Sequence, residues 1–420
     1  MDVAILGGGI AGLATAYRLA ARGAQVVLFE GERRLGGLGG TFALDGRRHE
    51  RFYHSVTASD DALTALLADA GLGDQCDWRR TTMGMIVDGV HYDFNTPADL
   101  LRFAPLTLPQ RLRLGGVGKS LRALGRGRDL DTISAEQWLR PLFGDAVWTK
   151  VIRPMFAMKF GDAPVPALYL YERLARESNV AMRAYPRAGY QGLADGIAAA
   201  VEQLGGRVMT ATPVRALERL DDKVLVTTDH EQIDARWAVS TLPLPLLEAV
   251  TVGELAAQLQ LPRLDYMGVV NMLFLTTRPL SGHYWSAVID SGVEFDGQIE
   301  MSALTGPAHF GGRHATYVMA YTDRRSALYH DTGVADRWRA QFLHLNGLDP
   351  DELERALLFK TSFVEPVWPL GYQSAKPAPR VGDSPLFLAT TAQAYPRVTS
   401  WNAAVQTANE TVDALTEVAE

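Results

Sequence analysis

The hydrophobic pattern at the start of the chain predicts a strand, a helix and a second strand. Val3 to Leu6 is a short apolar run, Leu13 to Arg22 has helical spacing, and Val26 to Phe29 is a second apolar run. A glycine-rich turn, Gly7 to Gly12, separates the first run from the helix. Two parallel strands joined by a helix require a right-handed crossover. The pattern therefore predicts a βαβ unit.

Four further blocks follow this unit. Residues 86–184 are rich in leucine, arginine and tryptophan and predict mostly helices, which prolines begin or end. Residues 185–245 combine a helical repeat, Leu193 to Leu204, with several short apolar strands. Strands dominate residues 262–374, and residues 385–420 predict one strand, a loop and a final helix. No repeat or low-complexity linker separates the blocks, so we expect interleaved domains.

The composition is that of an ordinary globular protein. It is 47% hydrophobic and 21% charged, and the net charge of −7 gives no reason to expect nucleic acid as a partner. Cys76 is the only cysteine, which excludes an internal disulfide and a thiolate metal cage and fits a reducing cytoplasm. The chain enters its first strand at Val3 without a basic leader, and no apolar run reaches about 18 residues. We therefore expect a cytoplasmic protein without a signal peptide, a membrane span or a metal.

The turn after the first strand has the form that binds a dinucleotide. Gly7 permits the tight turn, Gly9 lets a pyrophosphate approach the backbone, and Gly12 lets the helix pack closely on the strand. The phosphates then lie at a helix N-terminus, where free N–H groups favour negative charge. Those N–H groups belong to Ile10, Ala11 and Gly12. Glu30 ends the second strand, where its carboxylate can accept hydrogen bonds from ribose hydroxyls.

A second glycine-rich stretch follows Glu30 and distinguishes FAD from NAD. It reads Gly31, then Arg33-Arg34-Leu35-Gly36-Gly37, then Gly39-Gly40-Thr41. It resembles the second flavin motif of the glutathione-reductase-2 type FAD proteins, in which Arg-x-Gly-Gly and then Thr follow the acid. The resemblance implies non-covalent FAD, with Glu30 on the adenosine ribose and Arg34, Gly36 and Gly37 along the pyrophosphate and ribityl chain. It also implies contacts at Gly31, Gly39, Gly40 and Thr41.

Three distant segments resemble the same family. Residues 185–190, followed by a helix, resemble its central proline- and glycine-containing signature, and Pro213-Val214 resembles the strand that contacts the adenine. Residues 385–389 resemble the C-terminal strand that ends beside the flavin, and the helix from Trp401 would point its N-terminus at the flavin ring. The family usually has Gly-Asp after that strand, whereas this chain has Thr390-Thr391. The contacts expected there are Thr390, Thr391 and Thr399.

Together these features predict an α/β fold of two interleaved domains. A Rossmann-like FAD-binding domain, with a parallel sheet and the βαβ unit, would comprise residues 1–85, 185–260 and 375–420. A mixed α+β substrate domain would comprise a helical part, residues 86–184, and a sheet part, residues 261–374.

The whole pattern is similar to the flavin-containing amine oxidase and protoporphyrinogen-oxidase-like superfamily. This implies an FAD-dependent oxidoreductase that takes hydride from a small biosynthetic substrate at a C–N, C–O or C–C bond, with oxygen or another acceptor reoxidising the flavin. Two alternatives remain open. One is a non-redox isomerase similar to UDP-galactopyranose mutase, which acts on a nucleotide sugar, and the other is a flavin-binding protein without turnover. The sequence specifies neither the substrate nor the oligomeric state.

Two residues are candidates for catalysis. His54 resembles a histidine that the mutases carry near the flavin, and Tyr395 follows the C-terminal strand, where an aromatic ring could form a wall of the substrate cavity. His49 is interpreted as structural and Lys159 as a solvated lysine. Typical amine oxidases place a water-bridged lysine on a strand of the substrate domain, but here the strand Met267 to Leu275 contains Asn271 and no lysine.

The segment from residue 102 to residue 128 is basic. Among its charged residues there is no acid. A basic amphipathic stretch can sit on an anionic membrane surface or steer an anionic substrate, and it can also be an ordinary solvated helical face. We therefore expect peripheral membrane contact as one possible role of this segment.

Overall fold

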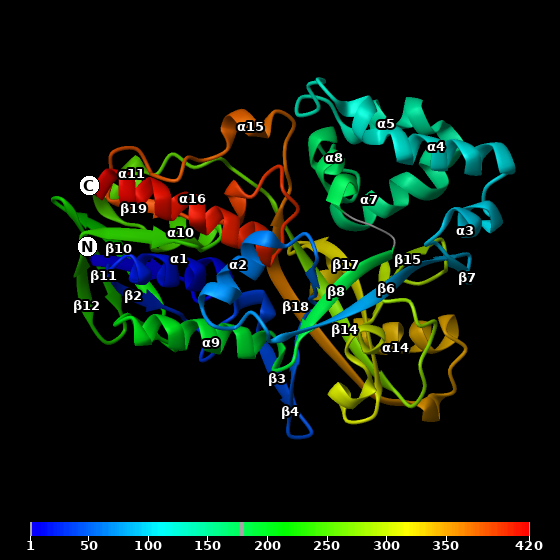
Figure 1. Cartoon of the computed structure of the whole chain (residues 1–420), viewed down its shortest axis with the longest axis horizontal. Coiled ribbons are helices and arrows are strands. Elements are labelled where there is room, and N and C mark those ends of the chain that lie inside the picture. Colours follow the sequence, from blue (N-terminus) through cyan, green and yellow to red (C-terminus); the bar gives the residue numbers. More distant parts are fainter. Residues whose placement is uncertain (1, 177–179, 420) are drawn as a thin grey trace.

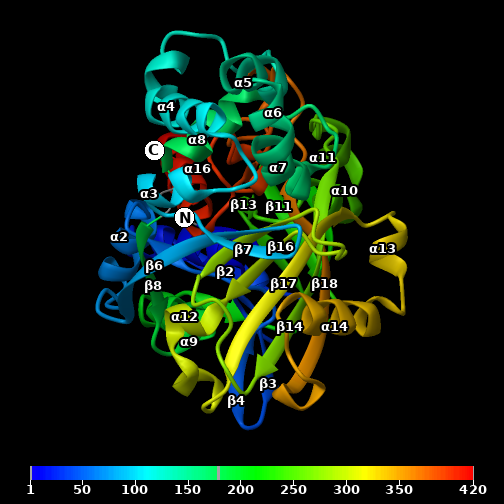
Figure 2. The ribbon, with the colours of Figure 1, turned by 90° about the vertical axis from the view of Figure 1, so that its right-hand side faces the viewer.

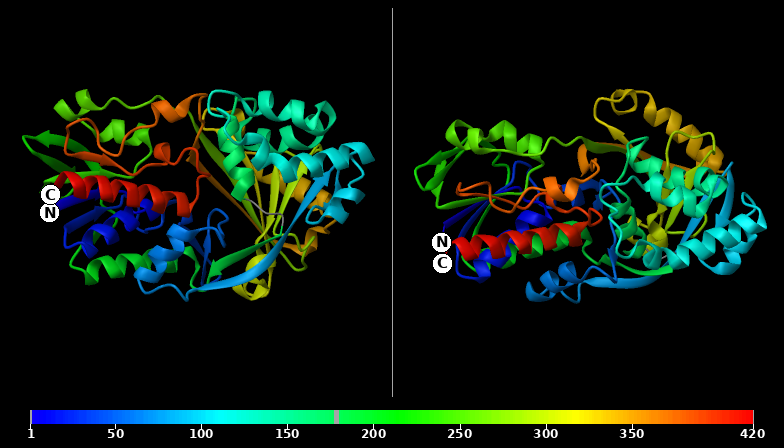
Figure 3. Two further views of the ribbon diagram at one scale, coloured as in Figure 1. Left: turned by 45° about the horizontal axis from the view of Figure 1, so that its top comes forward. Right: turned by 90° about the horizontal axis from the view of Figure 1, so that it is seen from above.

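The computed structural model describes residues 2–176 and 180–419 and has two lobes. One lobe is built on a five-stranded parallel sheet and the other on a nine-stranded sheet with a cap of helices. Both chain ends lie at the outer end of the parallel-sheet lobe (Figure 1). Figure 3 shows the two lobes side by side in two further views.

The parallel sheet confirms the βαβ unit. β1 (Asp2–Leu6), α1 (Ile10–Ala21) and β2 (Gln25–Phe29) follow one another as expected. The strand order is β19-β13-β1-β2-β9, and every pairing is parallel. The added strands are β9 (Arg207–Met209), β13 (Trp237–Ser240) and β19 (Leu386–Leu388).

Both faces of this sheet are buried, with the period of two that a strand requires. Val3 and Ile5 face a helical layer, whereas Ala4 and Leu6 face a small antiparallel sheet. The helical layer consists of α1, α9 (Gly189–Gln203) and α16 (Trp401–Ala419). The antiparallel sheet consists of β10 (Val214–Leu220), β11 (Lys223–Thr228) and β12 (Gln232–Ala235), followed by α10 (Leu244–Val250) and α11 (Gly253–Gln258). Helix α9 and strands β9, β10, β11 and β13 match the elements predicted for residues 185–245, whereas β12, α10 and α11 were not predicted.

The large sheet has the order β18-β14-β17-β16-β15-β6-β8-β5, with β7 paired to β6. The bounds are β5 (Val56–Thr57), β6 (Cys76–Val87), β7 (Val90–Asp93), β8 (Val180–Pro186), β14 (Tyr266–Thr276), β15 (Trp285–Ile289), β16 (Gly297–Glu300), β17 (His314–Asp323) and β18 (Leu353–Pro366). The domain boundary expected at residue 85 falls inside β6. Because β6 pairs with β8, β7 and β15, and β5 pairs with β8, the large sheet includes segments on the N-terminal side of the expected boundary.

The central strand β14 is buried on both faces. Val270, Met272 and Phe274 pack with α14 (Val334–Leu345), while Val269 and Leu273 face the other way and join the core shared with the parallel-sheet lobe. Figure 2 shows α14 outside the large sheet and the helical cap above it. The alternation places Asn271 on the face directed toward the parallel-sheet lobe.

The helical cap confirms the prediction for residues 86–184, apart from the short strands at its two ends. It contains α3 (Pro97–Arg102), α4 (Leu108–Gly125), α5 (Ala135–Phe143), α6 (Asp145–Val147), α7 (Arg153–Phe160) and α8 (Ala167–Arg176). The hydroxyls of Thr96 and Ser134 accept backbone hydrogen bonds and cap α3 and α5. Smaller elements complete the chain: β3 (Thr41–Leu44), β4 (Arg47–Glu50), α2 (Asp61–Asp69), α12 (Met301–Thr305), α13 (Ala327–His330) and α15 (Tyr372–Ala375).

His49 is a buried structural histidine, as the sequence suggested. Its ring stacks on Phe310 with centroids 4.9 Å apart, and neither ring nitrogen has a hydrogen-bond partner among the described residues. Burial, together with the positive charges of His309, Arg313 and Arg47, lowers the pKa of His49 to about 4. The imidazole is therefore neutral at pH 7.

We predict that His49→Leu stabilises the protein increasingly as the pH falls. Between pH 6.5 and 4 the unfolded chain protonates His49 and the folded chain does not, so this group lowers stability as the pH drops through that window. Because solvent screens part of the effect, we expect the variant to gain about 1–2 kcal/mol on the wild type between pH 7 and pH 4.5. Urea unfolding at both pH values measures this, and an equal difference at the two values would contradict it.

Candidate functional site

The glycine turn between β1 and α1 keeps a helix N-terminus free of side chains. Gly7 has a φ of 106°, and a Cβ on Gly12 would lie 1.9 Å from the Gly7 carbonyl oxygen, so only glycine permits this packing. Helix α1 begins after Gly9 with no side-chain cap and no acid in its first turn. A Cβ on Gly9 would meet only the Gly37 Cα, at 4.0 Å. The start of α1 is thus bare backbone, as an anion site requires.

Glu30 lies at the end of β2, beside this turn. One carboxylate oxygen accepts from the Gly8 N–H and the other from the Glu32 N–H, each at 2.7 Å. A Cβ on Gly31 would lie 3.4 Å from the Pro213 side chain. The structure therefore brings the predicted adenosine-side residues, Glu30, Gly31 and Pro213-Val214, together from segments that are far apart in the sequence.

The second glycine stretch packs against the first. The Gly36 N–H donates to the Gly8 carbonyl at 2.8 Å, and a Cβ on Gly37 would lie 3.3 Å from the Gly9 Cα. Further along, a Cβ on Gly39 would clash with the Trp401 ring at 2.6 Å, and one on Gly40 would clash with the Arg51 guanidinium at 2.6 Å. Arg34 is exposed, and its nearest polar contact is the Thr41 hydroxyl at 3.4 Å.

These two glycine stretches, residues 7–12 and 31–41, pack together into one cradle of backbone, which we call the glycine cradle. It offers N–H donors at the start of α1, a carboxylate at one end and aromatic side chains at the other. A long dinucleotide has the matching parts, with a ribose for the carboxylate, a diphosphate for the helix N-terminus and a flat ring for the aromatic end. The residues present therefore fit FAD.

The C-terminal segment reaches the cradle through α16. Trp401, its first residue, packs edge-on against Tyr190 with ring centroids 4.7 Å apart. The three threonines predicted to bind the cofactor differ in their surroundings. Thr390 is buried, and its hydroxyl accepts from the Ala392 N–H at 3.1 Å, whereas Thr399 donates to the Glu365 carboxylate at 2.9 Å. Thr391 is partly exposed beside Thr390.

His54 lies at the aromatic end of the cradle. Its ring centroid is 5.0 Å from that of Tyr190 and 6.3 Å from that of Trp401. Burial lowers the pKa of His54, so the ring is neutral at pH 7. Nδ1 lies 2.9 Å from the Phe52 carbonyl, which can only accept, so Nδ1 carries the proton and Nε2 is left as an acceptor.

Glu50 anchors the segment that carries His54. This buried carboxylate accepts from the Tyr185 hydroxyl at 2.5 Å and from the Tyr190 N–H at 2.9 Å, while the Tyr317 hydroxyl donates to the Glu50 carbonyl at 2.8 Å. Burial raises the pKa of Glu50. These bonds join β4, β8, α9 and β17 next to the cradle. No local sequence pattern marks these bonds, because the partners are more than 100 residues apart.

The structure places Tyr395 differently from the expectation. No part of its side chain is accessible, and it packs with Trp368 and Tyr372 in the core of the helical cap. Its hydroxyl donates to Asp131. Because a side chain that borders a cavity must have accessible surface, Tyr395 packs the core and does not form a cavity wall.

Lys159 is buried, contrary to the interpretation as a solvated lysine. Its ammonium group pairs with the Glu365 carboxylate, which also accepts from the hydroxyls of Tyr169 and Thr399, each at 2.9 Å. Although burial opposes the charged form, the Glu365 carboxylate raises the pKa of Lys159. The pair joins the helical cap to the end of β18 and to the loop before α16. Sequence reasoning missed Glu365 because no local pattern marks it.

Asn271 occupies the middle of β14 on the face toward the cradle. Its amide nitrogen donates to the Arg51 carbonyl at 2.9 Å, and its amide oxygen has no partner among the residues that the structure describes. On the same side, the Tyr53 and Tyr321 hydroxyls lie 3.2 Å apart. The site thus presents a neutral amide and two phenols.

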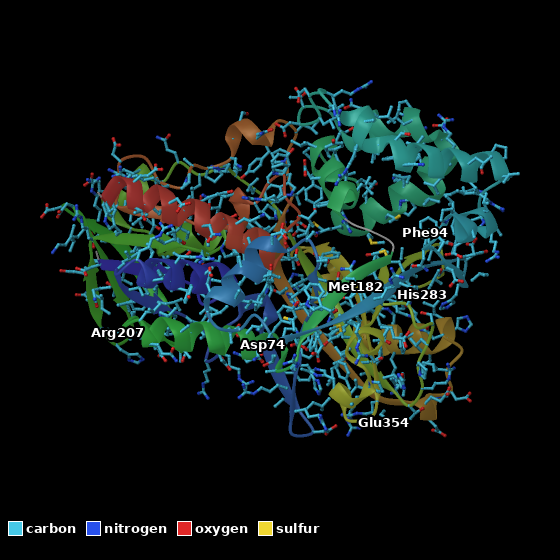
Figure 4. The ribbon with its side chains drawn as sticks, viewed as in Figure 1. Asp74, Phe94, Met182, Arg207, His283 and Glu354 are labelled. Atoms are coloured by element: carbon cyan, nitrogen blue, oxygen red, sulfur yellow. The ribbon has the colours of Figure 1, made fainter. Side chains whose placement is uncertain are left out.

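His283 lies away from this site, at the outer edge of the large sheet (Figure 4). Its ring bridges the Asp93 carboxylate at 2.9 Å and the Thr82 hydroxyl at 3.0 Å. A surface cleft of about 410 Å³ adjoins it, lined also by His91, Arg278 and Asn346. None of the described residues that line the cleft belongs to the glycine cradle.

Among the residues described, no helix combines the length and the apolar character needed to cross a membrane.

Comparison with solved structures shows the same fold at low sequence identity. A candidate protoporphyrinogen oxidase from Exiguobacterium sp. 255-15 superposes with a TM-score of 0.78 and 19% identity, covering 100% of this chain and 99% of that one. Putrescine oxidase bound to putrescine has a TM-score of 0.75 and 19% identity, with 99% of each chain covered. Reduced UDP-galactopyranose mutase has a TM-score of 0.79 and 15% identity, covering 99% of this chain and 96% of the mutase.

Sequence comparison identifies the family. AofH of Mycobacterium tuberculosis, a protein named as a candidate flavin-containing monoamine oxidase, is 26% identical over 276 residues, which are 58% of this chain and 57% of AofH. The flavin-containing amine oxidoreductases match over residues 10–415, nearly the whole chain. The chain therefore belongs to the flavin-containing amine oxidoreductase family, whose cofactor is FAD.

Proposed function

We propose that the protein is an FAD-dependent oxidoreductase that oxidises a small organic molecule. The observation that carries the proposal is the continuous glycine cradle, which ends at His54, Tyr190 and Trp401 and lies in a chain of this family. When bound, FAD supplies the hydride acceptor. The substrate loses a hydride from a carbon beside nitrogen, oxygen or a forming double bond, and it also loses a proton. Oxygen or another acceptor takes the electrons away.

The substrate would bind where the large sheet faces the cradle. Tyr53, Tyr321 and Phe359 have partly exposed side chains there, and Asn271 offers an amide oxygen without a protein partner. Aromatic walls with a few polar groups are the usual construction of a small-molecule pocket. The buried Lys159–Glu365 pair forms a fixed edge of this region, because Glu365 binds Thr399, two residues before Trp401.

The neutral residue on β14 sets this site apart from a simple amine oxidase. Those enzymes place a lysine on the corresponding strand, whereas this strand carries Asn271, held by the Arg51 carbonyl. Strand β14 therefore supplies no lysine for a lysine-dependent mechanism. His54 is instead the group with a free acceptor nitrogen beside the aromatic end of the cradle.

The mutase alternative is supported only by the fold and by the resemblance of His54 to a mutase histidine. UDP-galactopyranose mutase shares 15% identity with this chain, so its superposition speaks to architecture alone. The non-catalytic alternative has no residue in its favour either. Both remain as possible outcomes of the experiment that follows.

The decisive experiment is anaerobic titration of the purified holoprotein, followed by flavin absorbance, with separate amines, porphyrinogens, polyenes and nucleotide sugars. We expect one class to bleach the oxidised flavin and to yield a product with two fewer hydrogens. Failure of every class to reduce a bound flavin would support a binding protein. Turnover of a nucleotide sugar only after prior reduction, without net oxidation, would support the mutase alternative.

We predict that Gly9→Ala weakens FAD binding without unfolding the protein. The added Cβ meets no protein atom closer than 4.0 Å, and Gly9 has an ordinary φ of −71°, so the methyl group enters the cradle itself. Crowding of this kind costs about 1–3 kcal/mol, which corresponds to an affinity lower by about fivefold to 150-fold. Equilibrium dialysis with FAD measures it.

The matched control is Gly116→Ala, in helix α4, where a Cβ also meets nothing within 4 Å. It should leave FAD affinity unchanged. Circular dichroism of both variants should match the wild type. Wild-type FAD affinity in Gly9→Ala would show that the cofactor does not lie against this turn.

We predict that His54→Gln lowers the rate of flavin reduction by about 10²-fold, with FAD content retained. A neutral His54 accepts a proton at Nε2, so wild-type activity should be lost as the pH falls through its pKa, which burial places below 6.5. The measurement is stopped-flow flavin reduction between pH 5 and 8. The acid limb should disappear in the variant, and an unchanged limb would exclude His54 as the proton acceptor.

A further inference from the structure

The outer end of the helical cap exposes three large leucines. Leu101 is 46% exposed, Leu108 55% and Leu112 60%, on α3 and the first turns of α4. Figures 1 and 3 place these two helices at the end of the molecule opposite the chain termini. Water-facing leucines of this size, gathered at one corner, mark an interaction surface.

The corner that carries these leucines is held rigidly. The Arg111 guanidinium donates to the carbonyls of Leu101 and Leu106 at 2.5 and 2.6 Å, which ties the end of α3 to the start of α4. The buried face of α4 is made by other residues, among them Leu114 and Leu121. The exposed leucines are therefore not needed to fold the helix.

The same segment concentrates positive charge. Between Asp99 and Asp129 there is no acidic residue. The seven basic residues are Arg102, Arg111, Arg113, Lys119, Arg122, Arg126 and Arg128. Since the whole chain has a net charge of −7, the rest of it carries −14. The segment is therefore a positively charged region of an otherwise acidic protein.

Several of these charges are available to a partner. Lys119, Arg126 and Arg128 are exposed, and none forms an ion pair with any residue within 2–176 or 180–419. These three exposed cations, on the same helix as the exposed leucines or just after it, supply with them the two contacts that an interfacial surface needs, apolar insertion and attraction to anions.

We propose that this α3–α4 surface, formed by Leu101, Leu108 and Leu112 with the exposed Lys119, Arg126 and Arg128, docks on the surface of an anionic phospholipid bilayer. The leucines enter the boundary between headgroups and acyl chains, and the basic side chains meet lipid phosphates. A second copy of the chain would set like charges against each other across a two-fold axis. A nucleic acid would meet the arginines and leave the leucines in water. The inference is independent of the redox activity proposed above.

Flotation of the full FAD-loaded protein with vesicles tests the proposal. We expect binding to vesicles of phosphatidylcholine with phosphatidylglycerol, weaker binding to phosphatidylcholine alone, and release as salt is raised. Leu108→Gln with Leu112→Gln should lower the bound fraction at least fivefold. Lys119→Glu with Arg126→Glu should lower it by more than tenfold, since each cation contributes about fivefold to partitioning.

The control pair is Leu220→Gln with Lys223→Glu, an equally exposed leucine and lysine on the small antiparallel sheet of the other lobe. It should bind vesicles as the wild type does. Flavin absorbance and the thermal midpoint should be unchanged in every variant. Equal binding to neutral and anionic vesicles would overturn the proposal. So would wild-type binding by the leucine variant, since the α3–α4 surface would then be a general polyanion site rather than a lipid surface.

Discussion

The site depends on the close approach of backbone to backbone at the glycine turn. Gly12 must lie against the Gly7 carbonyl, and Gly37 must lie against Gly9, with no Cβ between them. This contact brings the second glycine stretch next to the start of α1 and leaves the first-turn amides free of side chains. The rest of the cradle depends on this contact, because it places Gly39 against Trp401 and Gly40 against Arg51.

The two lobes are joined by buried polar groups as well as by a shared apolar core. Glu50 binds tyrosines from β8 and β17 on the cradle side, and Glu365 binds Lys159, Tyr169 and Thr399 on the cap side. A buried carboxylate is tolerated only when its hydrogen bonds are made. Loss of one partner would leave a charge unpaired, at a cost of about 3–5 kcal/mol, so these groups fix the position of one lobe relative to the other.

Because the chain passes back and forth between the two lobes, the candidate functional residues come together at the boundary between them. The parallel sheet takes strands from three separate parts of the sequence, and the chain leaves it for the large sheet and the cap between them. His54 and Asn271 come from the two excursions, and Thr399 comes from the loop between β19 and α16, yet all three lie where the lobes meet. The proposed substrate region is therefore bounded by segments that are free to differ among proteins with the same fold.

The sequence by itself determined the βαβ unit, the glycine motifs, Glu30, and helix α9 and most strands of the parallel-sheet lobe. These features are local, because a turn, the period of two of a strand and the period of 3.6 of a helix each depend on residues that are close together in the sequence. Only the tertiary structure decided that β6 belongs to the large sheet from Cys76 onward, that Tyr395 is buried against Asp131 and that Lys159 pairs with Glu365. Those outcomes depend on which distant side chains meet, and whether a side chain is buried is settled by the packing of the whole chain around it.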